Sequence, residues 1–204
     1  MRPWHDRGRE DLEMHDTRER LLRTGERLFR QQGYAGTGLK QLAKEADAPW
    51  SSMYHFFPGG KEELATEVLR YAAEHYAAMI AKAFDAFTDP ADAIAAMFKG
   101  EAKILTESKF RNGCPVAGVT LDVASTVEAL RAPCATAFGL WVATIARGLA
   151  KGGLAEKDAQ ALASYVLSSL EGAIVLSRAA KSTAPLEATG AFVVRTVRAR
   201  LAER

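Results

Sequence analysis

The sequence predicts an all-α protein of about nine helices, in which a small N-terminal three-helix unit precedes a larger helical domain. Three observations support this fold class. Alanine is abundant, runs of β-branched residues are short, and no Asn-Gly turn stands between alternating apolar segments. The 204 residues are 48% hydrophobic, which is enough to build the cores of a small domain and a larger one.

The N-terminal arm, residues 1–15, lacks apolar periodicity and is expected to be disordered. Its Arg2, Arg7 and Arg9 are candidates for contacts in a DNA minor groove. Four acidic residues in the same segment cancel this charge, however, which favours a tail without a binding role.

The first helix is expected over residues 16–32, with Asp16 or Thr17 as its N-cap. An apolar stripe at helical spacing supports it, formed by Leu21, Leu22, Gly25, Leu28 and Phe29. Gly33 then ends the helix, because glycine readily adopts the left-handed conformation that closes a last turn.

Two short helices follow and predict a helix-turn-helix. Thr37 is expected to cap the second helix, and Pro49 lies near the start of the third, where a first turn tolerates proline. Asp47 and Ala48 form the tight turn between them, at a point that glycine or asparagine would adopt more easily. We interpret five residues as the small core of this unit: Leu39, Leu42, Met53, Phe56 and Phe57.

Six further helices are predicted in the rest of the chain. Lys61 opens a long helix that reaches about Phe87. The others are expected at residues 91–106, 116–124, 126–151, 156–180 and 185–201. Pro133 is expected to kink the helix that contains it or to lie near its start.

The charge distribution divides the chain into the same two domains, the helix-turn-helix at 16–60 and the body at 61–204. Residues 17–61 hold eight basic and four acidic side chains, whereas residues 62–204 hold sixteen of each. A basic head on a neutral body is typical of a DNA-binding unit joined to a domain that binds small molecules.

Several separated blocks resemble the DNA-binding domain of the TetR family. The blocks are Phe29-Arg30-Gln31-Gln32-Gly33-Tyr34, Thr37-Gly38-Leu39-Lys40-Gln41-Leu42-Ala43, Met53-Tyr54-His55-Phe56-Phe57 and Lys61-Glu62-Glu63-Leu64. The stretch 57–62 and the later Gly113-Cys114-Pro115-Val116 resemble the LmrA/YxaF-like branch of that family. The resemblance implies a homodimeric transcriptional regulator, most often a repressor, that a small molecule releases from double-stranded operator DNA.

The resemblance, together with residue chemistry, assigns the DNA-contacting residues. Nine side chains are expected to meet phosphates or base edges: Thr37, Lys40, Pro49, Trp50, Ser51, Ser52, Tyr54, His55 and Lys61. The alternative role of Thr37 is that of a helix cap, and the alternative for Lys40 is a lysine that is solvated and contacts nothing. Trp50 departs from the basic or small residue of many relatives, which favours apolar contact with thymine methyl groups.

A ligand pocket is expected in the body, because a regulator of this kind needs an apolar cavity with a few polar groups. Its predicted lining is Phe110, Cys114, Leu121, Phe138 and Trp141, with Asp122, Thr144 and Glu171 as polar groups that orient the ligand. For any one aromatic residue, ordinary core packing is the simpler alternative. The LmrA/YxaF-like resemblance implies a planar, aromatic or apolar effector.

The last two predicted helices carry apolar stripes suited to dimerisation. The expected interface residues are Leu167, Leu170, Ile174, Phe192, Val193 and Val197. Two such helices from each copy would form a four-helix interface. An internal core alone would leave a similar pattern, so the dimer rests partly on the family resemblance.

Other functions are disfavoured by what the sequence lacks. It has no phosphate loop, nucleophile elbow or metal-ligand spacing, so no catalytic site, metal or cofactor is expected. A nucleophilic Cys114 with His75 as its base is the enzyme alternative. We interpret Cys114 and Cys134 as small buried residues, with a redox switch as the alternative. No apolar run reaches the length of a membrane span and residues 1–14 are charged, so a cytoplasmic protein is expected.

Two alternatives keep the same fold. One is a transcriptional activator, because the sequence does not encode where an operator lies. The other is a helical interaction module with a degenerate DNA-binding head, to which Trp50 and the modest basic excess point.

Overall fold

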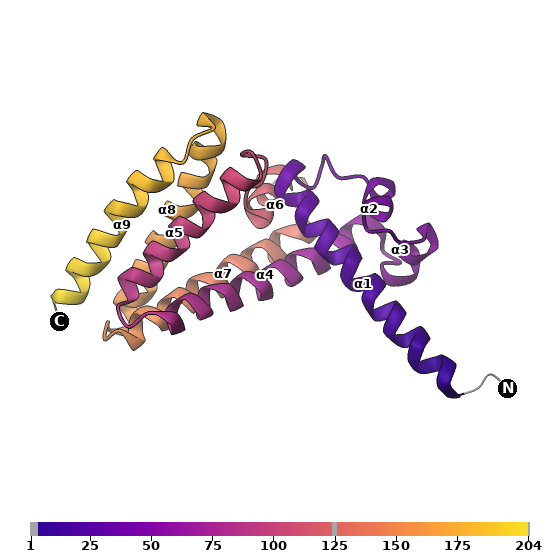
Figure 1. Ribbon diagram of the computed structural model, residues 1–204, viewed down its shortest axis with the longest axis horizontal. Coiled ribbons are helices and arrows are strands. Elements are labelled where there is room, and N and C mark those ends of the chain that lie inside the picture. Colours follow the sequence, from indigo (N-terminus) through magenta and orange to yellow (C-terminus); the bar gives the residue numbers. More distant parts are fainter. Residues whose placement is uncertain (1–3, 124–125, 204) are drawn as a thin grey trace.

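The computed structural model describes residues 4–123 and 126–203, with the side chains of 16–123 and 126–203, and this part of the chain forms nine α-helices without a strand. The helices are α1 Trp4–Gln32, α2 Leu39–Glu45, α3 Trp50–Phe56, α4 Gly60–Ala86, α5 Pro90–Glu107, α6 Pro115–Val123, α7 Glu128–Lys151, α8 Glu156–Ala180 and α9 Ala184–Ala202. The predicted all-α class with a helix-turn-helix head is confirmed (Figure 1).

The first helix begins at Trp4, well before the predicted start, so the expected caps at Asp16 and Thr17 are wrong. Arginine, glutamate, leucine and methionine make up most of residues 7–14 and favour helical backbone even where no apolar stripe exists. Residues 1–3 of the arm that was expected to be disordered lie outside the described residues.

The head packs α2 and α3 against the middle of α1 around a small core. Leu42, Met53 and Phe57 are buried there, whereas the predicted core residues Leu39 and Phe56 are half-buried against it. Residue Asp47 has a φ of 49°, the left-handed conformation that the sequence position predicts for this turn.

A side chain of α1 fixes the turn between α2 and α3. The Arg20 guanidinium donates hydrogen bonds to the carbonyl oxygens of Ala46 and Asp47, at 3.1 and 3.2 Å. These bonds satisfy carbonyl groups that the end of a short helix leaves without partners. The orientation of α3 relative to α1 is therefore set by a side chain as well as by apolar packing.

The body is a bundle in which α4 runs from the head to the far end of the molecule alongside α7 (Figure 1). The helix α8 packs on α7, and α9 covers α5 and α8. The short α6 lies between body and head, where it contacts both α1 and α7. Pro133 lies within α7, in its second turn, near the start of the helix as one of the two predicted alternatives has it.

Two helices of the body, α7 and α8, are long and apolar enough to cross a membrane by length and composition alone. This differs from the expectation that no segment has the required length. Both helices pack within the bundle, and the core helices of soluble proteins pass the same test.

Candidate functional site

The exposed face of α3 is aromatic and polar. Trp50 and Tyr54 are 42% and 53% exposed, and their rings meet edge to face with centroids 5.5 Å apart. Ser51 and His55 are exposed on the same short helix, and Ser52 is half-buried. Because Met53 anchors the opposite side of α3 in the head core, these side chains are held outward.

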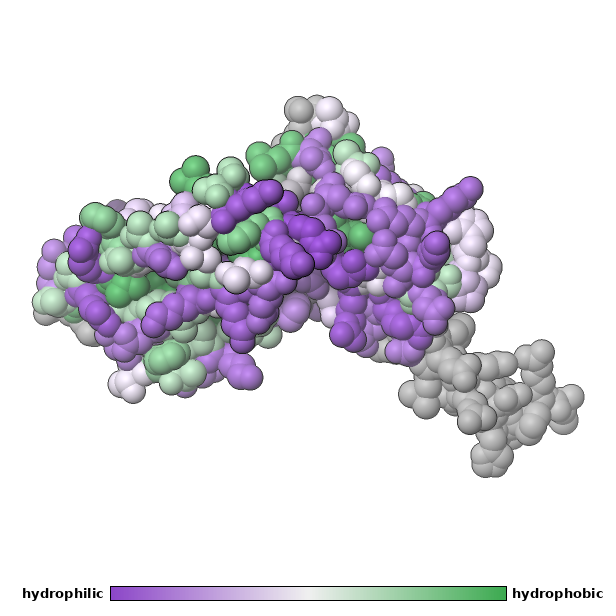
Figure 2. Space-filling view, turned by 45° about the horizontal axis from the view of Figure 1, so that its top comes forward, coloured by the Kyte–Doolittle hydropathy of each residue, from purple (hydrophilic) through white to green (hydrophobic). Residues whose placement is uncertain are grey.

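Three further predicted residues border this face. Lys40 on α2 and Pro49 before α3 are exposed. Lys61, in the first turn of α4, is half-buried with its ammonium 4.3 Å from the centre of the Tyr34 ring. Burial lowers the pKa of Lys61, and the nearby Asp122 carboxylate opposes this shift. Hydrophilic side chains dominate the head half of the surface in Figure 2, which suits contact with a hydrated polyanion.

Thr37 does not lie on this surface. The residue is buried, and its hydroxyl donates a 2.7 Å hydrogen bond to the Gly33 carbonyl. The N-cap of α2 is Gly38, so the predicted capping role of Thr37 is wrong. The hydroxyl instead closes the turn that follows α1, because Gly33 has ended that helix and left its carbonyl without a helical partner.

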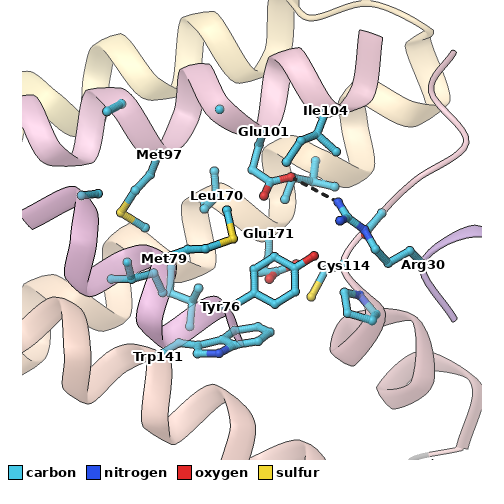
Figure 3. Close-up of a pocket in the computed structure, with 18 residues that line it drawn as sticks. Arg30, Tyr76, Met79, Met97, Glu101, Ile104, Cys114, Trp141, Leu170 and Glu171 are labelled. Atoms are coloured by element: carbon cyan, nitrogen blue, oxygen red, sulfur yellow. Dashed lines mark hydrogen bonds and ion pairs between the residues drawn. The ribbon is translucent and has the colours of Figure 1, made fainter. Parts of the chain in front are cut away.

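A cavity of about 170 Å³ lies in the body between α4, α5, α7 and α8 (Figure 3). Its wall is mainly apolar and aromatic, as in small-molecule sites. The wall residues are Arg30, Tyr76, Met79, Ile80, Ala83, Ala96, Met97, Gly100, Glu101, Ile104, Gly113, Cys114, Pro115, Trp141, Leu167, Leu170, Glu171 and Ile174. The indole Nε1 of Trp141 donates to the Ala73 carbonyl at 2.9 Å, which fixes that ring in the wall.

Buried polar groups gather at the end of the cavity nearest the head. Glu171 Oε2 and the Tyr76 hydroxyl have no hydrogen-bond partner there. Burial raises the pKa of Glu171 to about 7, and a hydrogen bond from the Cys114 thiol opposes that shift. Burial also raises the pKa values of Tyr76, Glu101 and Cys114. Unpartnered buried polar atoms carry a cost in free energy, which a ligand with complementary groups would remove.

Arg30 links this cavity to the DNA-binding head. The residue belongs to the last turn of α1, yet its guanidinium lies 3.9 Å from Glu101 and 5.7 Å from the centre of the Tyr76 ring. Its Nε donates to the Gly113 carbonyl at 2.9 Å, and the Gly113 amide donates to the Arg30 carbonyl at 2.8 Å. The head therefore contributes a side chain to the wall of a cavity that otherwise belongs to the body.

The structure brings three of the predicted ligand residues, Cys114, Trp141 and Glu171, to the cavity wall. The other five do not line it. Leu121 is 79% exposed on α6, and the Asp122 carboxylate accepts from the Ala35 amide at 3.1 Å, so it connects α6 to the head.

The remaining three predicted ligand residues serve in packing. Phe138 stacks edge to face behind Trp141, and Phe110 is half-buried where the chain turns after α5 with a φ of 59°. The Thr144 hydroxyl is satisfied within α7 by the Leu140 carbonyl. Sequence reasoning missed Arg30, Tyr76 and most of the α4 and α5 wall, because the apolar spacing of a helix does not tell which face meets a cavity.

Most of the residues expected in the dimer interface are buried inside a single copy, so they cannot contact a second copy. Leu167, Leu170 and Ile174 are buried and line the cavity, and Val193 and Val197 are buried in the core of the body. Only Phe192 of the predicted set is exposed. The cause is that the strongest apolar stripe of α8 and of α9 packs into the body, and the exposed apolar side chains of α8 lie on a second, weaker stripe.

Replacing Glu171 with glutamine is expected to raise the free energy of unfolding above neutral pH by up to about 3 kcal/mol. The raised pKa of Glu171 means that the folded state holds the proton more tightly than the unfolded chain, for which the pKa is 4.5. The contribution of Glu171 to stability is therefore fully present below pH 4.5 and is lost as the pH rises through about 7. Urea unfolding of both proteins between about pH 5 and pH 8 measures this difference. If the free energy of unfolding fell with pH as steeply in the variant as in the unaltered protein, the prediction would be wrong.

A helix-turn-helix head joined to a larger helical body is the architecture of a DNA-binding transcriptional regulator. Residues 21–68 match the model of the bacterial regulatory proteins of the tetR family, and residues 90–192 match that of the LmrA/YxaF-like transcriptional regulator C-terminal domain. The chain belongs to the TetR family, in its LmrA/YxaF-like branch.

Relatives and solved structures agree with this assignment. The uncharacterized HTH-type transcriptional regulator YxaF of Bacillus subtilis is 40% identical over 84% of this chain and 90% of its own length. The HTH-type transcriptional regulator LmrA of the same organism is 37% identical over 84% of this chain and 91% of its own length. A crystal structure of regulatory protein TetR from Rhodobacter sphaeroides shares the fold, with a TM-score of 0.77 and 22% identity over 87% of this chain and 96% of that chain.

Family membership makes the protein a DNA-binding transcriptional regulator and not an enzyme. The enzyme alternative also lacks support from geometry. His75 lies 3.5 Å from Glu26 at the junction of α1 and α4, and it is not among the residues that line the cavity with Cys114.

Proposed function

We propose that this protein is a homodimeric, cytoplasmic repressor that leaves its operator when a small apolar or aromatic molecule enters the body cavity. The observation that carries the proposal is the position of Arg30. One helix, α1, supports the recognition helix and also supplies a wall residue of the cavity. Occupation of the cavity and placement of the head are therefore physically connected.

The helix α4 provides a second connection. It begins at Gly60 beside the head and contributes Tyr76, Met79 and Ile80 to the cavity wall further along. A ligand that moves this helix would change the separation of the two recognition helices in a dimer. Because operator half-sites lie about 34 Å apart or at a multiple of that distance, such a change lowers operator affinity.

The dimer that we propose uses the outward faces of α8 and α9. Exposed apolar side chains gather on these faces: Tyr165, Val175, Leu176 and Phe192. The exposed Gly172 and Ala179 continue the α8 face at helical spacing and permit close approach of a second helix. Several exposed apolar side chains on two neighbouring helices are typical of a protein interface.

The proposal predicts that Tyr54→Phe and Lys40→Met each weaken operator binding about tenfold. Both side chains are exposed on the proposed DNA face, and the phenylalanine retains the ring contact with Trp50. Fluorescence anisotropy with DNA from upstream of the protein's own gene, at two salt concentrations, measures the loss. The lysine variant should also show a salt dependence reduced by about one phosphate contact.

The matched control is Lys157→Met, which removes an exposed lysine from the first turn of α8, at the end of the body opposite the head (Figure 1). Its operator affinity should equal that of the unaltered protein. Equal affinities for all three variants would contradict the proposed DNA face, and tight binding without salt dependence would contradict phosphate contact altogether.

A further inference from the structure

The cavity contains an acidic group, Glu171, that has no ion-pair partner among the described residues. Arg30 is the only basic side chain among the wall residues that the structure describes, and Glu101 lies opposite it at 3.9 Å. Glu171 is the second acid of the wall, and no base lies within ion-pair distance of it in the described structure. Its Oε2 is buried and has no hydrogen-bond partner.

The surroundings of Glu171 are suited to a cation. The rings of Tyr76 and Trp141 meet at a centroid distance of 5.4 Å and form a joined aromatic wall beside the carboxyl group (Figure 3). Aromatic faces attract positive charge, most strongly where water is excluded. The Tyr76 hydroxyl, which has no partner of its own, supplies a second oxygen that can accept a hydrogen bond from the same donor group.

We propose that the effector of this protein is an organic cation, an aromatic ring system carrying an ammonium group that binds Glu171 and lies against Tyr76 and Trp141. This inference rests on the proposed role of the cavity as the effector site. The ammonium donates to the unpartnered oxygen of Glu171, while the ring system fills the apolar remainder formed by residues such as Met79 and Met97. Methionine adapts its shape to planar ligands, which suits such a wall.

The size of the cavity limits the ring system. An engineered protein cavity of roughly 150 Å³ holds a benzene molecule. The volume here is about 170 Å³, so an ammonium group carried on a single aromatic ring fits.

A bound cation also has a direct route to the head. Arg30 lies above the Tyr76 ring, close enough to influence the Glu171 carboxyl electrostatically. A positive charge at Glu171 repels the Arg30 guanidinium, which is bonded to Gly113 and carried by α1. The charge of the ligand thereby weakens the docking of the head on the body.

The test compares benzylamine with its neutral counterpart benzyl alcohol. Affinities are measured by isothermal titration calorimetry on the full-length protein, on Glu171→Gln, and on the control Glu107→Gln, which alters an exposed glutamate at the end of α5. Release of operator DNA is measured on the same samples. The amine is expected to bind about tenfold more tightly than the alcohol, and to lose that advantage in Glu171→Gln only.

The pH dependence of the two affinities distinguishes recognition of the ligand's charge from recognition of its shape. An aliphatic ammonium stays protonated below the range where lysine titrates, whereas Glu171 ionises near pH 7. Amine affinity should therefore rise from about pH 6 to about pH 8, and alcohol affinity should stay constant. The charged and titratable groups that face Glu171 are Arg30 on α1, Tyr76 on α4, Glu101 on α5 and Cys114 before α6, and all four remain in the variant.

Each outcome decides between the two proposals. Equal or tighter binding of the alcohol overturns the cation inference and leaves the cavity as an effector site. Absence of binding by both probes overturns the cation inference as well. Amine binding that Glu171→Gln abolishes, without release of operator DNA, supports the cation site and overturns the proposed effector role of the cavity.

Discussion

Replacing Leu176 with aspartate is expected to convert the protein into a monomer and to lower operator affinity by about a hundredfold. Leu176 is 60% exposed on the outward face of α8, and Phe192 on α9 is 64% exposed. A carboxylate at that position would be taken out of water in the dimer without a partner, which costs several kcal/mol. A monomer carries one recognition helix and loses the gain of simultaneous binding to two half-sites.

Sedimentation velocity at micromolar concentration measures the oligomeric state, and anisotropy measures operator affinity. Leu121→Asp is the matched control, because Leu121 is as apolar and 79% exposed, but lies on α6 away from α8 and α9. This control should remain dimeric. A dimeric Leu176→Asp variant with full operator affinity would show that the copies associate elsewhere.

The dimer face illustrates where sequence reasoning stops. The spacing of Leu167, Leu170 and Ile174 correctly identifies one apolar stripe of α8, but this stripe faces the cavity. The outward stripe contains Leu176 and Val175 among small and polar residues, and it is the weaker signal. Periodicity gives the faces of a helix and not their surroundings, so a helix with two apolar faces cannot be oriented from one sequence.

The head was more predictable because its elements are short and local. Glycine, proline and aspartate at the turns fix where α2 and α3 begin and end, and the φ of Asp47 follows from its position. The hydrogen bonds of Arg20 to the turn were not predictable, because they connect residues 26 and 27 positions apart. The role of Thr37 is unpredictable for a similar reason, because its hydroxyl donates back to the Gly33 carbonyl and does not cap α2.

The sequence predicts an apolar cavity with a few polar groups in the body, but it identifies only some of the residues that line it. Trp141 and Glu171 of the wall can be chosen from the sequence, since aromatic and acidic residues on apolar helices are unusual enough to notice. Arg30 could not, because on α1 it resembles the other basic residues of the head. Only the packing of α1 beside the loop that carries Gly113 brings it into the body.

Replacing Arg30 with methionine is expected to lower the free energy of unfolding by about 2 kcal/mol, because it breaks a charged hydrogen bond and a partly buried ion pair and leaves one charge without a partner. Methionine keeps the apolar stem but removes the bond to the Gly113 carbonyl and the charge opposite Glu101. Burial already raises the pKa of Glu101, and Arg30 is the group that opposes this shift. The loss should appear in urea unfolding near neutral pH.

Arg27→Met provides the comparison, because Arg27 lies one turn earlier on α1 and pairs with Glu45 at the surface. Such exposed pairs contribute little because water screens them, so this variant should be nearly as stable as the unaltered protein. The double variant Arg30→Met with Glu101→Gln should recover part of the lost stability, since it no longer leaves a carboxyl group without its cation. If Arg30→Met were as stable as Arg27→Met, the contacts of Arg30 with the body would not contribute to stability. The helix α4 would then be the remaining connection between the cavity and the DNA-binding head.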